Sequence, residues 1–412
     1  MGKVAKSDDT EGRETFTEAP LRGIAEAAQC SEPVCGLTHA FYRYPARFSP
    51  AFARAAILAF SQPGETVLDP FMGGGTTLVE ASALGRRGVG TDINPLATFV
   101  TTVKTTPLTQ GELGEIIGWG EAVIPAVNLH APSCRATAWA AKGYHRNIND
   151  RSTWTIRKIL EMVLAHLNEL QTQGQRRFAR CVLLRTGQWA LDCRTAVPRA
   201  DEFRRQFLYC LRAMIAGAQE YSEAVGYAQG SRPAGHDASP VCLTRSVIGI
   251  ETDLALKAAF PPALILTSPP YPGVHVLYHR WQVRGRRETP APFWIVGCAD
   301  GNGEAYYSFG DRKQQGLEQY YNHLLRAYKS VAQIADARSV LVQLVAFSDP
   351  SWQLPKCLSV LNEAGFREVK SSSIANSRDG RVWRSVPHRK WYANQRGTTT
   401  GGSEVVLFHR LA

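Results

Sequence analysis

Two consecutive prolines stand directly behind an apolar run in ALILTSPPYPGV, residues 263–274. Proline has no backbone N–H and a fixed φ, so Pro269 and Pro270 cannot continue a sheet and must turn the chain out of it. The turn holds Ser268 and Tyr271 at the carboxyl end of a predicted strand. Ligands bind at that edge of open α/β sheets, so we expect the functional site there.

A glycine-rich turn is the second group of residues whose spacing could bind a ligand. In DPFMGGGTT, residues 69–77, Asp69 ends a predicted strand, and Thr76 and Thr77 begin a predicted helix. Glycines let the backbone approach a ligand closely, and a helix N-terminus offers unpaired N–H groups. Asp92 ends the next predicted strand, where a carboxylate can accept both hydroxyls of a ribose. The pattern leaves two cofactor classes open, dinucleotides and S-adenosylmethionine.

The elements that must position these residues alternate between strand and helix. Apolar strand patterns at 66–71 and 87–93 flank a helical pattern at 76–84, which predicts a parallel β-α-β unit with a right-handed crossover. Amphipathic helices with no strands between them then run from about 107 to 240. Strand patterns return at 246–250, 263–267, 339–347, 367–374 and 404–410.

These patterns therefore predict a Rossmann-like α/β fold with a mainly parallel central sheet flanked by helices and a helical insertion. We predict a flexible N-terminal segment at 1–36, a cofactor-binding half at 37–106, the helical insertion at 107–240 and a catalytic half at 241–412. The insertion lies between the two halves, as a target-recognition domain would.

Composition narrows the class of partner and the compartment. The chain has 412 residues, a net charge of +11 and a sequence pI near 9.3, which favours a polyanionic partner. Its nine cysteines form no CxxC pair, which argues against a disulfide framework or a zinc ribbon, and we expect a reducing cytosol and no metal ion. The first twenty residues lack an apolar signal-peptide core, and no stretch of about 18 apolar residues occurs, so we expect neither secretion nor a membrane span.

Four segments in register resemble one enzyme family. DPFMGGGTT looks like the cofactor loop of the S-adenosylmethionine-dependent DNA amino-methyltransferases, and TSPPY matches their (Asp/Asn/Ser)-Pro-Pro-(Tyr/Phe) motif. HAFYRYPARFSP is similar to their segment upstream of the glycine loop, and TDINP lies at the acid after it. The resemblance covers residues 39–105 and 246–347 and leaves the helical insertion unmatched.

The resemblance implies S-adenosylmethionine as the cofactor, together with a set of residues that bind it. Asp253 would recognise the adenine amino group, with Glu251 as an alternative, although either acid could instead cap a helix. The expected cofactor-binding residues are Tyr44, Phe48, Asp69, Phe71, Gly73, Gly75, Thr76, Thr77, Asp92 and Asp253.

The resemblance also implies a catalytic group made of Ser268, Pro269, Pro270 and Tyr271. An aromatic amine is a poor nucleophile because its lone pair is delocalised into the ring. Acceptors at Ser268 Oγ and the Pro269 carbonyl would bind its N–H groups and return the lone pair to the nitrogen. Tyr271 would stack on a base flipped out of the duplex. Serine at the first motif position favours cytosine N4 as the target, with adenine N6 as the alternative.

Basic and aromatic residues are interleaved in two segments, 278–294 and 376–397, a composition that suits contact with DNA. The expected nucleic-acid-binding residues are Arg280, Trp281, Arg284, Arg286, Arg287, Arg381, Arg384 and Arg389.

The predicted protein is a DNA methyltransferase of a prokaryotic or phage-infected cytoplasm, associated with the nucleoid. A cognate restriction endonuclease, acting separately, is a possible partner. Two further functions remain open: an RNA guanine-N2 methyltransferase, and a DNA-binding protein that has lost catalysis.

Overall fold

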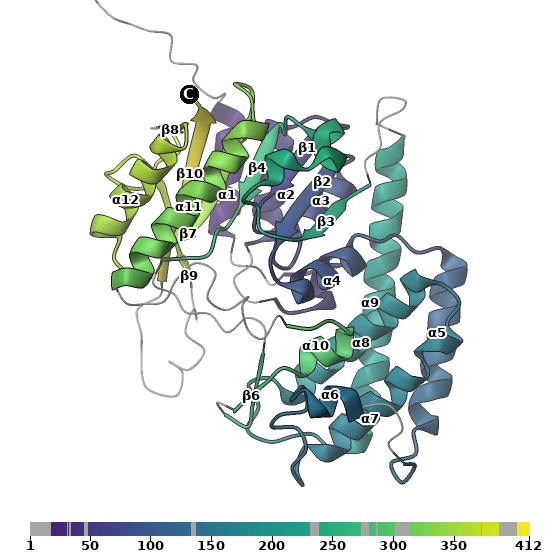
Figure 1. Cartoon of the computed structure of the whole chain (residues 1–412). Coiled ribbons are helices and arrows are strands. Elements are labelled where there is room, and N and C mark those ends of the chain that lie inside the picture. The colour runs from purple at the N-terminus through teal and green to yellow at the C-terminus, as the bar shows by residue number, and fades with distance from the viewer. Residues whose placement is uncertain are drawn as a thin grey trace, which may run out of the picture.

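The computed structural model describes residues 18–30, 32, 34–44, 48–132, 137–230, 239–272, 280–285, 287–300, 314–371, 373–386 and 402–412. These residues form an α/β unit with a predominantly helical region beside it (Figure 1). No helix in these ranges is long and apolar enough to cross a membrane.

A mostly parallel sheet forms the centre of the α/β unit. Its order is β3 (Val241–Thr244), β2 (Arg87–Asp92), β1 (Thr66–Asp69), β4 (Leu264–Thr267), β7 (Val340–Ala346), β10 (Gly402–Leu411) and β8 (Phe366–Val369). The first five strands are parallel, whereas β10 is antiparallel to β7, to β8 and to β9 (Val382–Val386). The chain visits β1 and then β2 and β3 on one side before β4 begins the other, so the sheet has the doubly wound, Rossmann-like order that the sequence predicts.

Both faces of the sheet are covered by helices. On β4, Leu264 and Leu266 pack towards α1 (Glu18–Gln29) and α2 (Pro50–Phe60), while Ile265 packs towards α11 (Gln314–Ile334) and α12 (Pro350–Glu363). Successive strand residues point to opposite faces, so continuous apolar strands such as these fit a sheet that is buried on both sides.

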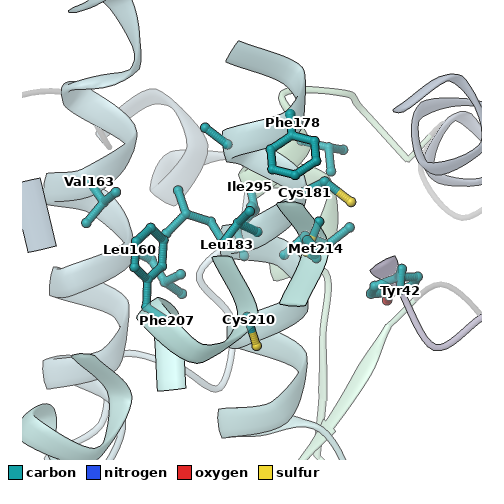
Figure 2. Close-up of a cluster of buried hydrophobic side chains, with 14 of the residues drawn as sticks. Tyr42, Leu160, Val163, Phe178, Cys181, Leu183, Phe207, Cys210, Met214 and Ile295 are labelled. Atoms are coloured by element: carbon teal, nitrogen blue, oxygen red, sulfur yellow. The ribbon is translucent and has the colours of Figure 1, made fainter. Parts of the chain in front are cut away.

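Five helices build most of the region beside the sheet. They are α5 (Gln110–Ala126), α6 (Thr137–Ala141), α7 (Trp154–Ala165), α8 (Gln173–Leu191) and α9 (Ala200–Gln229). Figure 2 shows Leu160, Phe178, Leu183 and Phe207 gathered in the buried apolar cluster between α7, α8 and α9. On α7 and α9 the buried apolar residues recur at spacings of three and four, the amphipathic pattern that predicts a helical insertion from the sequence.

A segment from much later in the chain completes this helical region. The hairpin of β5 (Trp281–Val283) and β6 (Arg287–Thr289) and the short α10 (Ala291–Val296) contribute their apolar side chains to the same cluster. Trp281 packs so closely on α8 that a Cβ added at Gly187 would lie 2.8 Å from its ring. Residues 281–296, which the sequence analysis assigned to the catalytic half, therefore pack with the helices of the insertion.

Helix α4 (Pro95–Lys104) links the sheet to the helical region. It begins immediately after the carboxyl end of β2, capped by Asn94, whose side chain accepts from the backbone N–H of Leu96 at 3.0 Å. It packs against β2 and β3 and also against α8 and α10. The carboxyl edge of the sheet is therefore close to the helical region (Figure 1).

Two local expectations differ from the structure. The predicted strand at 246–250 is wrong, because the edge strand β3 lies at Val241–Thr244 and Gly249 takes a left-handed φ of +84° that begins the 3₁₀ helix η3 (Ile250–Thr252). Residues 18–29 are an ordered helix rather than part of a flexible segment, since Leu21 and Ile24 of α1 are buried against α2 and the sheet.

Candidate active site

Asp69 connects the ends of two neighbouring strands to the glycine turn through hydrogen bonds. Its Oδ1 accepts from the Thr267 hydroxyl at 2.8 Å and from the Phe71 backbone N–H at 3.1 Å. Its Oδ2 accepts from the Thr77 hydroxyl at 2.6 Å. One buried carboxylate thus joins β1, the start of α3 (Thr76–Ala83) and the residue that precedes Ser268. Burial raises the pKa of Asp69 to about 6.

The glycine turn needs glycine at two positions for different reasons. Gly75 has a φ of +73°, and a Cβ there would lie 2.5 Å from the Thr101 hydroxyl oxygen of α4. Gly74 has no room for a side chain because a Cβ would meet the Tyr44 Cβ at 2.8 Å. Lys104 Nζ donates to the Gly74 carbonyl at 2.7 Å, so α4 also holds the outer side of the turn.

Asp92 lies at the carboxyl end of β2 and accepts two backbone hydrogen bonds. Oδ2 accepts from the Gly73 N–H at 3.0 Å, and Oδ1 accepts from the Asn94 N–H at 2.8 Å. An ionised carboxylate has about four acceptor positions. Asp92 therefore keeps one further acceptor position on each oxygen, which fits the two hydroxyls of a ribose. Burial raises the pKa of Asp92 to about 6.

The three predicted aromatic contacts of the cofactor occupy different places. Tyr44 lies against the glycine turn, and its hydroxyl accepts from Asn94 Nδ2 at 3.1 Å. Phe48 is only 5% exposed and packs edge-on against Phe52 of α2. Phe71 is half-buried and packs on the sheet face that α11 covers. The structure therefore brings Tyr44 to the turn and Phe48 into the core beside α2.

Asp253 follows η3 and is paired with a basic neighbour. Its Oδ2 accepts from Arg245 Nη1 at 3.1 Å, immediately beyond β3. Glu251, the alternative acid, lies within η3, and its Oε2 is buried without a hydrogen-bond partner among the described residues. Both acids lie beyond the edge strand β3, at the end of the sheet where Asp92 also lies.

The turn after β4 brings Ser268 and Tyr271 into direct contact. Ser268 Oγ lies 3.0 Å from the Tyr271 hydroxyl, and that hydroxyl donates to Glu404 Oε1 at 2.9 Å. The Tyr320 hydroxyl of α11 donates to the Pro270 carbonyl at 2.7 Å. Tyr271 is 9% exposed, so most of its ring is covered by protein.

Glu404 and Tyr320 were missed by the sequence analysis. Glu404 directly precedes the apolar run VVLF, and an acid beside such a run is the signal that could have identified it. Tyr320 lies on an amphipathic helix, where an aromatic residue is usually part of the core, and no sequence pattern distinguishes it.

Most of the predicted DNA-binding residues already have partners within the protein. Trp281 is 2% exposed and donates from Nε1 to the Tyr42 hydroxyl at 3.0 Å, while Arg280 pairs with Asp300 at 2.9 Å. Arg381 pairs with Glu368 and Asp379, and Arg384 pairs with Glu404.

Two of these residues remain on the surface. Arg284 is exposed near Asp150 at 3.6 Å, and Arg287 is exposed on β6. Arg286 and Arg389 lie outside the described residues. DNA binding by all eight residues remains a prediction.

Comparison with known proteins identifies the segment that carries the glycine turn. Residues 23–98 match the family model for N6/N4-type DNA methylases. The type II methyltransferase M.MvaI of Kocuria varians is 42% identical over 84 residues, 20% of this chain and 18% of that protein. The type II methyltransferase M.MjaII of Methanocaldococcus jannaschii is 33% identical over 66 residues, 16% of this chain and 12% of that protein. The chain therefore spans less than a fifth of the length of these relatives.

Within residues 23–98, these matches support the resemblance read from the motifs: the segment is similar to N4/N6-type DNA methylases, a family that implies S-adenosylmethionine as the methyl donor. The match includes the glycine turn and Asp92 but ends well before Ser268. Two solved structures of the rRNA methyltransferase aviRa from Streptomyces viridochromogenes were also found, at 12% identity. They have TM-scores of 0.34 and 0.33 and cover 91% and 93% of this chain and 90% and 91% of theirs. Scores this low carry no argument about function.

Proposed function

We propose that this chain is a DNA methyltransferase that transfers a methyl group from S-adenosylmethionine to the exocyclic amine of a flipped-out base, with cytosine N4 as the target. The observation that carries the proposal is the hydrogen bond between Asp69 and Thr267. It joins the glycine turn of the matched family segment to the strand that presents Ser268, so that the two motifs share one sheet edge.

The residues present fit the proposed cofactor. Asp92 would accept the ribose hydroxyls on its two remaining acceptor positions, and the N-terminus of α3 beyond Gly75 would face the ligand with backbone N–H groups. Tyr44 lies against the turn, where it would flank the methionine end. When bound, S-adenosylmethionine supplies an electrophilic methyl group on a sulfonium sulfur.

Ser268 and Pro269 would prepare the nucleophile. The target amine would donate one N–H to Ser268 Oγ and the other to the Pro269 carbonyl, which draws the nitrogen towards tetrahedral geometry. Its lone pair is then available to form the N–C bond as the C–S bond breaks. The methylated amine carries a positive charge and regains neutrality by losing a proton to solvent. Positioned polar groups of this kind supply a large share of many enzymatic rate enhancements.

The side chain at position 268 supports cytosine N4 over adenine N6. Serine provides a neutral dipole, whereas the aspartate that is more typical of adenine enzymes provides a full negative charge. The net charge of +11 supports a polyanionic substrate. M.MvaI and M.MjaII are both named as type II methyltransferases. We therefore also propose a cognate restriction endonuclease, encoded separately, as a partner.

The proposal is tested by incubating the protein with labelled S-adenosylmethionine and either plasmid DNA or, in parallel, RNA. Each nucleic acid is then digested to nucleosides, and the labelled nucleoside is identified by mass. We expect N4-methyldeoxycytidine. N6-methyldeoxyadenosine would replace the cytosine assignment with the adenine one. Label in RNA guanine and none in DNA would overturn DNA as the substrate, and binding of DNA without any transfer would assign the chain to inactive DNA-binding proteins.

A further inference from the structure

A line of hydrogen bonds runs from the catalytic turn into the neighbouring part of the sheet. Ser268 Oγ lies 3.0 Å from the Tyr271 hydroxyl, which donates to Glu404 Oε1 at 2.9 Å. The other carboxylate oxygen, Oε2, accepts from Arg384 Nη2 at 2.6 Å and Nε at 2.8 Å. The line thus joins Ser268 to an ion pair that the sequence motif does not contain.

The chemistry of these groups fixes the direction of each hydrogen bond. A guanidinium only donates, and an ionised carboxylate only accepts. The single proton of the Tyr271 hydroxyl must therefore point to Glu404. Between Ser268 and Tyr271 the donor then has to be Ser268, because Tyr271 already donates its only hydroxyl proton to Glu404.

We infer that Glu404 is a positioning residue that sets Ser268 as a hydrogen-bond acceptor for the target amine, acting through Tyr271. With its own proton directed at the tyrosine oxygen, Ser268 presents lone pairs to a substrate N–H. If the tyrosine proton pointed at Ser268 instead, it would occupy one of the two lone pairs of Ser268, and the serine proton would compete with the remaining lone pair for the position that faces the amine. This inference rests on the proposed methyl transfer to an exocyclic amine.

The backbone around Glu404 holds it in place for this role. Glu404 lies in β10 between two strands, in register with Ala346 of β7 and with Arg384 of β9. Only 6% of its surface is exposed, so water competes little for its oxygens. A charge-assisted hydrogen bond in such surroundings is stronger than one in water.

A purely structural role for Glu404 has to be distinguished from this one, because Glu404 also neutralises the Arg384 side chain, which is 12% exposed. Glu404→Gln separates the two roles. Arg384 can only donate, so it would take the amide oxygen, and the amide NH₂ would then face Tyr271 and donate to it. The tyrosine proton would turn towards Ser268, which reverses the acceptor arrangement.

The experiment measures kcat and KM for DNA at saturating S-adenosylmethionine in the wild type, Glu404→Gln, Tyr271→Phe and the double variant. We expect each single variant to lower kcat about tenfold or more, the scale of a hydrogen bond to a charged group, with KM changed less than about twofold. Tyr271→Phe keeps the buried aromatic ring and removes only the hydroxyl. In the double variant Glu404→Gln should cause no further loss, because Glu404 reaches Ser268 only through the phenol oxygen.

Glu161→Gln is the matched control, since Glu161 is 6% exposed and pairs with Arg157 at 2.7 Å on α7, within the helical region. It should leave kcat unchanged. Additive losses from Glu404→Gln and Tyr271→Phe, or an unchanged kcat in Tyr271→Phe, would overturn the inference and leave the proposed function intact. Tyr271→Phe decides the matter even if Glu404→Gln does not fold. A wild type that methylates no DNA would overturn the proposed function and, with it, this inference.

Discussion

The carboxyl edge of the sheet and the helical region use polar residues in opposite ways. At the sheet edge, Asp69 accepts from Thr267, and Asp92 accepts two backbone N–H groups and keeps further acceptor positions. In the helical region, Arg280 is paired with Asp300 and Trp281 is buried against α8. We propose that the first pair prepares the site for a ligand, whereas Arg280 and Trp281 stabilise the packing of the hairpin on the helices.

This difference shows that a sequence motif can predict where its residues lie in the fold, whereas a local amino-acid composition cannot. Asp69 ends β1 and Ser268 follows β4, its parallel neighbour, so strand geometry alone brings them together. An arginine beside a tryptophan has no such constraint. The same composition suits a surface that binds nucleic acid and a buried cation–aromatic core, and only the fold decides between them.

The largest effect is expected for the stability of Trp281→Ala. Removing a buried tryptophan that packs on Gly187 and bonds to Tyr42 should lower the free energy of unfolding by about 3–5 kcal/mol. Urea denaturation with an unchanged m-value measures it. Fluorescence anisotropy with labelled duplex DNA, under conditions where the variant is folded, should show the wild-type affinity. Weaker DNA binding at unchanged stability would instead place Trp281 among the DNA contacts.

At the sheet edge the largest effect is expected for Ser268→Ala. Losing one preorganised acceptor should lower kcat about 10²-fold while the Kd for S-adenosylhomocysteine stays close to that of the wild type. Single-turnover methylation and calorimetric titration give the two quantities. Ser222→Ala on α9, which removes a half-buried hydroxyl bonded to Leu108, is the control and should change neither. A variant that bound the ligand weakly yet turned over normally would contradict the catalytic role of Ser268.

The sequence predicted the fold and most of this edge because each feature has a local physical cause. The β-α-β order, the glycines at positive φ and the prolines that end β4 are all visible in short segments. The strand expected at 246–250 is wrong because Val247 is buried in a bend and Ile250 in the 3₁₀ helix η3, which an apolar pattern cannot distinguish from a strand. Glu404 stands out as an acid beside an apolar run, but its contact with Tyr271 could not be predicted, because Tyr271 is far away along the chain and meets it only through the antiparallel pairing of β10.

A smaller effect is expected from protonation of Asp92. Its pKa is raised to about 6 by burial, so the carboxylate that can accept ribose hydroxyls is present above that pH and is lost as the pH falls through it. Affinity for S-adenosylhomocysteine should therefore be constant from pH 7 to 8 and fall below pH 6. Asp92→Asn should weaken binding about tenfold at pH 8, since the amide presents a donor to one of the two backbone N–H groups.

Asp69 titrates in the same range, with a pKa also raised to about 6 by burial, and must be separated from Asp92. In Asp92→Asn the pH dependence that remains belongs to Asp69 and to the strand ends that it joins. A full wild-type pH profile in this variant would show that Asp92 does not bind the ligand.

The smallest effect is expected at Arg287, which is exposed on the β5–β6 hairpin. A phosphate contact there contributes through counterion release, so Arg287→Ala should weaken DNA binding only a few-fold at moderate salt and reduce the salt slope by about 1. Arg338, which is 80% exposed just before the amino end of β7, is the matched control because that end of the sheet lies opposite the Ser268 edge. Equal effects of the two substitutions would mean that net charge, rather than the hairpin surface, attracts DNA. The hairpin would then contribute only packing to the helical region, and specific contacts with the substrate would be confined to the carboxyl edge of the sheet.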